Sequence, residues 1–165
     1  RLIAPVLSFT ADEIWRELPG PREESVHLAS FPRFETSLLD ADLEARYDKL
    51  LAVRSDVSKA LETARIDKLI GHSLDARVLV EAPAGEWREL LANYRDELAT
   101  LFIVSQTEVV DDLPGDAAGG EVPGLKVRVE KAVGAKCERC WNYAVTVGSV
   151  SEHPSICARC LEALT

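Results

Sequence analysis

The chain of 165 residues is 47% hydrophobic and 28% charged, a balance typical of a globular protein long enough to bury a core. Its 19 basic and 28 acidic side chains give a formal charge of -9, which excludes binding of nucleic acid or an anionic membrane by bulk attraction. Any such contact must therefore be local.

Apolar runs in the chain are only a few residues long, far short of the roughly 20 that a membrane-spanning helix needs. No charged-then-apolar signal segment opens the chain, so we expect a cytoplasmic protein with no membrane contact. The chain starts at Arg1 and contains no methionine, and we therefore expect it to be part of a longer protein.

The first predicted helix runs from about Thr10 to Leu18. Thr10 and Glu13 have the spacing of a capping box, in which the two side chains satisfy unpaired backbone N–H groups at a helix start. Pro19 and Pro21 end this helix, because proline lacks the N–H and clashes with a continuing turn. Residues 20–36 are predicted to form an extended connector.

The longest predicted helix covers Leu39–Ile66, where apolar residues recur at three- and four-residue steps. We expect the charged residues of the other face, Asp56 among them, to be solvated, although the basic ones can follow a phosphate backbone. Gly71 is predicted to close this helix in a left-handed conformation. The apolar stripe comprises Leu43, Tyr47, Leu50, Val57, Leu61 and Ala64.

A small α+β unit is predicted over residues 74–131. Alternating apolar residues and a high content of Val, Ile and Thr indicate strands, whereas helical spacing and turn residues indicate the segments between them. The predicted order is strand Leu74–Glu81, helix Gly85–Leu98, strand Leu101–Val110, loop 111–120 and strand Leu125–Glu130.

All four cysteines lie near the end of the chain, where Cys137 and Cys140 form one C-x-x-C hook and Cys157 and Cys160 a second. Two such hooks separated by sixteen residues fit a tetrahedral four-thiolate zinc site. Disulfides are the main alternative, but no secretory signal supports them, and a redox C-x-x-C pair would not need a second copy. We predict one structural zinc per chain, with no open position to activate water.

Basic and aromatic residues accompany the hooks. Arg139 and Arg159 either offset the charge of about -2 on a four-thiolate zinc or reach outward to phosphate. Trp141 either packs over the zinc as a small core or stacks on an exposed base. Alternation places Lys126 and Arg128 on one face of the preceding strand, and this cluster predicts a local RNA contact. The motifs of phosphate loops, serine hydrolases and zinc proteases are absent, so no catalytic residue is predicted.

Several segments resemble class I aminoacyl-tRNA synthetases. The residues from Leu2 to Pro5 and from Ser8 to Trp15 resemble the end of the anticodon-binding helical domain of the enzymes for Ile, Val and Leu. The stretches 53–65 and 70–76 are similar to bacterial isoleucyl-tRNA synthetases in particular. Residues 137–143 and 153–160 match the C-terminal zinc finger of that family.

The resemblance implies an α+β fold of several units: the end of an anticodon-binding helical domain at 1–70, a small α+β junction domain at 71–131 and a zinc-finger domain at 132–165. The implied partners are the anticodon stem-loop of tRNA(Ile) and the remaining domains of the synthetase, whose parent enzyme is expected to be monomeric. ATP would bind only in a catalytic domain outside this chain, because the HIGH and KMSKS signatures are absent, and this fragment is expected to be non-catalytic.

Two other hypotheses stay open. The same finger type with the same gap resembles the C-terminal zinc finger of bacterial formamidopyrimidine-DNA glycosylases, although a chain that starts Arg1-Leu2 does not supply their N-terminal proline nucleophile. A purely structural or protein-interaction module, in which zinc only folds the tail, agrees with the net charge of -9.

Overall fold

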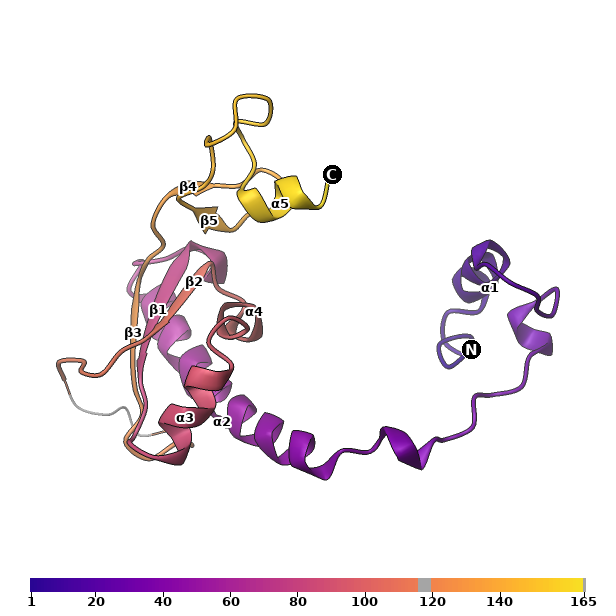
Figure 1. Cartoon of the computed structure of the whole chain (residues 1–165), viewed down its shortest axis with the longest axis horizontal. Helices are drawn as coiled ribbons and strands as arrows, with labels where there is room; N and C mark the ends of the chain where they lie inside the picture. Colours follow the sequence, from indigo (N-terminus) through magenta and orange to yellow (C-terminus); the bar gives the residue numbers. More distant parts are fainter. Residues whose placement is uncertain (116–119, 165) are drawn as a thin grey trace. The chain divides into compact units, whose positions relative to one another are not determined.

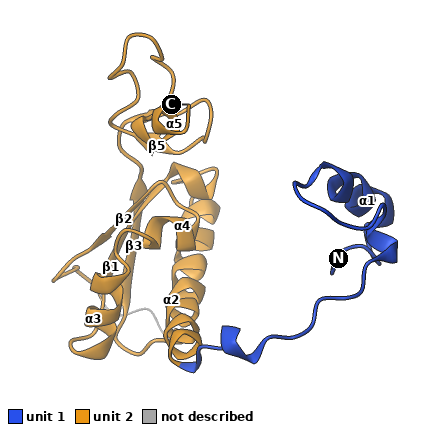
Figure 2. Ribbon diagram, turned by 45° about the vertical axis from the view of Figure 1, so that its right-hand side comes forward, with its two compact units in different colours: residues 1–41 blue, residues 42–165 orange. Residues whose placement is uncertain are grey.

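The computed structural model describes residues 1–115 and 120–164. The chain divides into two compact units, residues 1–41 and residues 42–165 (Figure 2). Residues 116–119 of the predicted loop 111–120 lie outside the described residues. No helix in the described ranges is long and apolar enough to cross a membrane.

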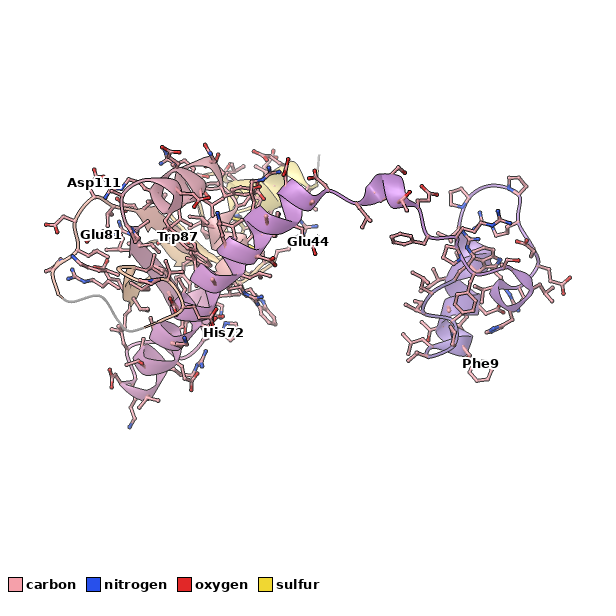
Figure 3. All side chains as sticks on the ribbon, turned by 90° about the horizontal axis from the view of Figure 1, so that it is seen from below. Phe9, Glu44, His72, Glu81, Trp87 and Asp111 are labelled. Atoms are coloured by element: carbon pink, nitrogen blue, oxygen red, sulfur yellow. The ribbon has the colours of Figure 1, made fainter. Side chains whose placement is uncertain are left out.

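The first unit contains helix α1 (Ser8–Glu17) and two short 3-10 helices, η1 (Val26–Leu28) and η2 (Thr36–Leu38). Helix α1 confirms the first predicted helix, including its end before Pro19. The predicted capping box is wrong, because Thr10 already lies inside α1 and no side chain caps its start. Phe9, labelled in Figure 3, is 89% exposed.

Asp12 of α1 folds the following segment back onto its own helix. Its Oδ1 accepts hydrogen bonds from Ser25 Oγ at 2.6 Å and from the Val26 N–H at 3.0 Å. The bond from Ser25 is the largest cause of the lowered pKa of Asp12. Val26 is consequently buried, so the prediction of an extended connector over residues 20–36 is wrong for the turn around η1.

Helix α2 (Ala41–Ile66) confirms the longest predicted helix. Four members of its apolar stripe are buried, whereas Leu43 and Tyr47 near its start are 40% and 38% exposed. The prediction that Gly71 closes the helix in a left-handed conformation is wrong. Lys68 takes this conformation instead, with φ of 59°, directly after the last turn.

The second unit has a three-stranded sheet in the order β2-β1-β3 (Figure 1), with β1 parallel to β2 and antiparallel to β3. The strands confirm the three predicted ones, but the second starts five residues later, because Leu101 and Phe102 end a helix. The predicted helix Gly85–Leu98 ends early, at Asn93, and a separate short helix begins at Leu98. The elements are η3 (Ser73–Asp75), β1 (Ala76–Glu81), α3 (Glu86–Asn93), α4 (Leu98–Phe102), β2 (Gln106–Val109) and β3 (Lys126–Lys131).

The two faces of this sheet have different surroundings. Ala76, Val78 and Val80 of β1 are fully buried and join one core with residues of α2, α3 and α4. Because successive strand residues point to opposite faces, Glu81 lies on the other face, where it pairs with Lys126 at 3.1 Å. Glu81 is labelled in Figure 3. The outer face therefore carries charge pairs and the inner face carries the core.

Asp56 of α2 is only 8% exposed, so its predicted place on the solvated face is wrong. Its two carboxylate oxygens accept the N–H groups of Glu121 and Val122, each at 2.9 Å, and Lys59 Nζ lies 3.1 Å away. Burial raises the pKa of Asp56, but these donors outweigh it and the net pKa is lowered. The two backbone donors are more than sixty residues away in the chain, and helical periodicity does not reveal such distant contacts.

Replacing Asp56 with alanine is expected to lower the free energy of unfolding by about 3 kcal/mol, because two backbone donors lose a charged acceptor. Since the pKa is lowered in the folded chain, the stabilisation is present above the ordinary value of 3.8 and is lost as pH falls through the folded value. Urea unfolding at pH 7 and pH 3 checks both statements. An equal difference between the two proteins at both pH values would contradict them.

Candidate metal centre and nucleic-acid interface

Two short turns build the cysteine hooks in the tail, which also contains β4 (Ala135–Lys136), β5 (Tyr143–Ala144) and α5 (Ala158–Glu162). In the first hook the Trp141 N–H donates to the Cys137 carbonyl at 2.8 Å. In the second, Cys157 caps α5 and its carbonyl accepts the Cys160 N–H at 3.0 Å. Each turn brings the two thiols of its hook close together.

The four Sγ atoms all lie within 4.8 Å of one another. Cys140 Sγ and Cys157 Sγ are 3.7 Å apart, and a zinc tetrahedron with bonds of about 2.3 Å has edges of about 3.8 Å. Within residues 1–115 and 120–164 this is the one group of His, Cys, Asp or Glu side chains placed to hold a metal. The donor set fits a closed, structural zinc site, with four protein ligands and no free position.

The surroundings of the thiols differ. Burial raises the pKa of Cys137, but backbone N–H groups of Cys140, Cys157 and Arg139 outweigh it and lower the value to about 6. Burial and contacts with the other cysteines raise the pKa of Cys160 to about 12. Zinc binding must therefore release protons, because the ligands are thiolates.

The tail is tied to the sheet by two residues that the sequence analysis did not single out. Gln106, the first residue of β2, donates to the Val133 carbonyl at 2.7 Å and accepts its N–H at 2.9 Å. Ser105 Oγ accepts the Tyr143 N–H at 2.7 Å and donates to the Leu74 carbonyl at 2.5 Å. No motif marks these residues, since their partners come from distant parts of the chain.

Trp141 directly follows the first hook and is 62% exposed. Its φ of 66° lies in the left-handed region, which bulky residues rarely adopt. Lys136 Nζ lies 5.9 Å from the centroid of the ring. The alternative in which Trp141 packs over the zinc as a small core is therefore wrong, and its ring is free to contact a partner.

Two family models match the chain. Residues 1–80 match the anticodon-binding domain of tRNA ligase, and residues 134–163 match a zinc finger found in FPG and IleRS. The second match includes all four cysteines but covers both kinds of enzyme, so it does not separate the synthetase hypothesis from the glycosylase hypothesis. The first match favours a tRNA ligase.

Whole-chain relatives decide between them. An isoleucine-tRNA ligase of Syntrophotalea carbinolica is 66% identical over 100% of the chain, and one of Geobacter sulfurreducens is 50% identical over 99%. Over its whole length the chain matches the C-terminal part of isoleucine-tRNA ligases. A third ligase, from Moorella thermoacetica, is 44% identical over 97% of the chain. The segment spans 18% of the length of each of these isoleucine-tRNA ligases, in their C-terminal part. The glycosylase hypothesis is not favoured.

The five predicted RNA-binding residues lie in two places in the fold. One place is the tail, residues 133–164, which contains Arg139, Arg159 and Trp141. Arg139 Nη1 donates to the Cys160 carbonyl at 3.1 Å, and the hydrogen bond with Cys140 raises the pKa of Arg159. The two arginines thus lie close to the thiols whose charge they were predicted to offset.

The other two predicted contacts are the first and third residues of β3, whereas the tail follows the last residue of this strand. Lys126 pairs with Glu81 and also donates to the Leu113 carbonyl at 3.0 Å. Arg128 Nη2 donates to the Pro114 carbonyl at 3.3 Å. The fold thus leaves Lys126 and Arg128 in the half of β3 that lies away from the hooks, each with a protein partner.

Proposed function

We propose that this segment binds the anticodon stem-loop of tRNA(Ile) and so positions the tRNA for aminoacylation. Isoleucine activation with ATP takes place in parts of the ligase outside this segment, which form its other partner. The zinc is structural, and the parent enzyme is a cytoplasmic monomer. Contacts made far from the reacting atoms raise the rate by fixing the orientation of the substrate.

The exposed ring of Trp141 carries this proposal. A left-handed backbone costs a non-glycine residue about 1–2 kcal/mol, which glycine at the same position would avoid. The ring is 62% exposed, so packing offsets little of this cost. Strain of this kind is typical of functional sites. A solvent-facing indole beside Lys136 supports stacking on an unpaired base, since every base has an aromatic face.

The remaining predicted contacts belong to the same proposal. Arg139 and Arg159 hold the hook that presents Trp141 and reach phosphate groups near its base. Lys126 and Arg128 contact the RNA backbone from the half of β3 that lies away from the hooks. The units 1–70, 71–131 and 132–165 then act as helical, junction and zinc-finger domains.

Replacing Trp141 with glycine in the complete ligase tests the stacking role. Glycine removes the ring and tolerates the positive φ, so the hook is expected to keep its zinc. Loss of one stacked base is expected to weaken tRNA(Ile) affinity by about 5- to 150-fold. Fluorescence titration with tRNA transcripts measures the change, and metal analysis confirms the zinc.

Val145 offers a matched control, because it is also exposed in the tail, at 74%, but has no aromatic ring. Val145→Ala is expected to leave tRNA affinity unchanged, and Trp141→Phe is expected to retain most of it. A zinc-loaded Trp141→Gly ligase with the affinity of the native enzyme would show that the ring does not contact tRNA.

A further inference from the structure

A basic cavity of the second unit lies where the end of α2, β3 and the tail meet. It has a volume of about 590 Å³. Its basic lining residues are Arg65 in the last turn of α2, Lys68 two residues after that helix and Lys131 at the last position of β3. Tyr143 of β5 also lines it, and Asp75 is the one acidic residue in its lining. No predicted RNA contact lies in this cavity.

The basic charges that line the cavity are only partly cancelled within the protein. Asp75 Oδ2 is occupied by the N–H groups of Gly71 and His72, at 3.1 and 2.8 Å. Arg65 pairs with Glu62. Lys68 and Lys131, in contrast, make no ion pair with any residue of the ranges 1–115 and 120–164. Two lysines therefore face an open cavity on a chain whose net charge is -9.

Helix stabilisation accounts for only part of this arrangement. Basic residues near the end of a helix interact favourably with its dipole, which explains Arg65 and Lys68. Lys131 comes from a different element. Strand alternation places it on the face opposite Lys126 and Arg128, the face that packs against α2. Lys131 thus lies on one side of the sheet, and Lys126 and Arg128 lie on the other.

Neighbouring residues link the cavity to the hook that presents Trp141. Tyr143 lines the cavity and pairs in the β4–β5 ladder with Lys136, whose amino group lies over the Trp141 ring. A chain of lysines and aromatic rings therefore runs from the end of α2 to the first hook. Alternating cations and aromatic faces are what a nucleic-acid strand requires, the cations for phosphate and the rings for bases.

We propose that Lys68 and Lys131 bind a backbone phosphate of the tRNA whose loop reaches Trp141. This inference rests on the proposed function and adds a second contact to it. The phosphate enters the cavity from its open side, and the two ammonium groups replace its counterions. Lys126 and Arg128 do not take part in this contact, because they lie on the opposite face of the sheet.

The test compares the complete ligase with its Lys68→Gln, Lys131→Gln and doubly substituted variants in titrations with tRNA(Ile) at several salt concentrations. The double substitution is expected to weaken affinity about tenfold and to reduce the slope of log K against log salt by about one. Arginine at both positions keeps the charge and is expected to restore both values.

Arg95 is the matched control, an exposed basic residue between α3 and α4 and outside the cavity lining. Arg95→Gln is expected to change neither affinity nor slope. An effect as large as that of Lys68→Gln would show that only overall charge matters and would overturn the proposal. Unchanged binding by the double variant, with binding still weakened in Trp141→Gly, would overturn the phosphate contact and leave the proposed function standing. Native affinity in the double lysine variant and in Trp141→Gly alike would contradict both the phosphate contact and the proposed function.

Discussion

Replacing Cys140 with serine is expected to abolish zinc binding and to unfold residues 133–164, while the sheet and α2 remain folded. The buried core of the tail consists of Cys137, Cys157 and Cys160, with only a few partly buried neighbours. This core is the metal site itself, so folding of the tail depends on the ion. Four-cysteine zinc sites supply about 10–16 kcal/mol of apparent binding free energy. The sheet has a separate core of seventeen buried residues and does not need the metal.

Metal analysis and a two-dimensional amide NMR spectrum measure this effect. Tail resonances are expected to collapse toward random-coil positions in Cys140→Ser and in chelated native chain, whereas those of residues 42–131 stay in place. Chelation followed by added zinc should restore the native spectrum. Dispersed tail resonances without zinc, or two disulfides that persist in reducing buffer, would contradict the claim that folding of the tail depends on zinc.

Replacing Gly134 with alanine is expected to destabilise the tail by about 3 kcal/mol or more. A Cβ at this position would lie 2.4 Å from the Ala144 carbonyl carbon and 2.6 Å from the Val145 nitrogen, both of which are backbone atoms. Its φ of 98° is also unfavourable for alanine. Because zinc binding and tail folding are coupled, the loss is expected to weaken zinc affinity by about 100-fold, as measured by competition with a chelator.

A substitution at Gly148 distinguishes the effect of the steric clash from the effect of backbone strain. Gly148 has a φ of 86° in the same tail, but the nearest atom to its Cβ position is 3.6 Å away. Gly148→Ala is therefore expected to cost only the conformational strain, about 1–2 kcal/mol. Equal zinc affinities in the two variants would show that the close approach of β4 and β5 does not limit the stability of the tail.

Local patterns predicted the elements whose causes are local. The apolar period identified α2 over most of its length, alternation identified β1 and β3, and cysteine spacing identified the four thiols that lie close together. The spacing was sufficient because a tetrahedral thiolate site admits few arrangements of two hooks.

The errors have both long-range and local causes. Asp56 is a charged residue of a helix, and it becomes buried only because residues 121 and 122 pack over it and donate their N–H groups to its carboxylate. Lys68 adopts the left-handed turn that glycine was expected to take at Gly71, whose own N–H instead binds Asp75. The cavity at Lys131 depends on three elements that meet only in the folded chain.

The most direct test of the central claim compares two activities of the complete ligase that carries Cys140→Ser. Isoleucine activation, measured as isoleucine-dependent exchange of pyrophosphate into ATP, needs no tRNA contact from this segment and is expected to stay at the native rate. The kcat/KM for aminoacylation of tRNA(Ile) is expected to fall at least tenfold, because the hook that presents Trp141 is lost. Native aminoacylation, or an equal fall in both activities, would contradict a segment that acts by positioning tRNA.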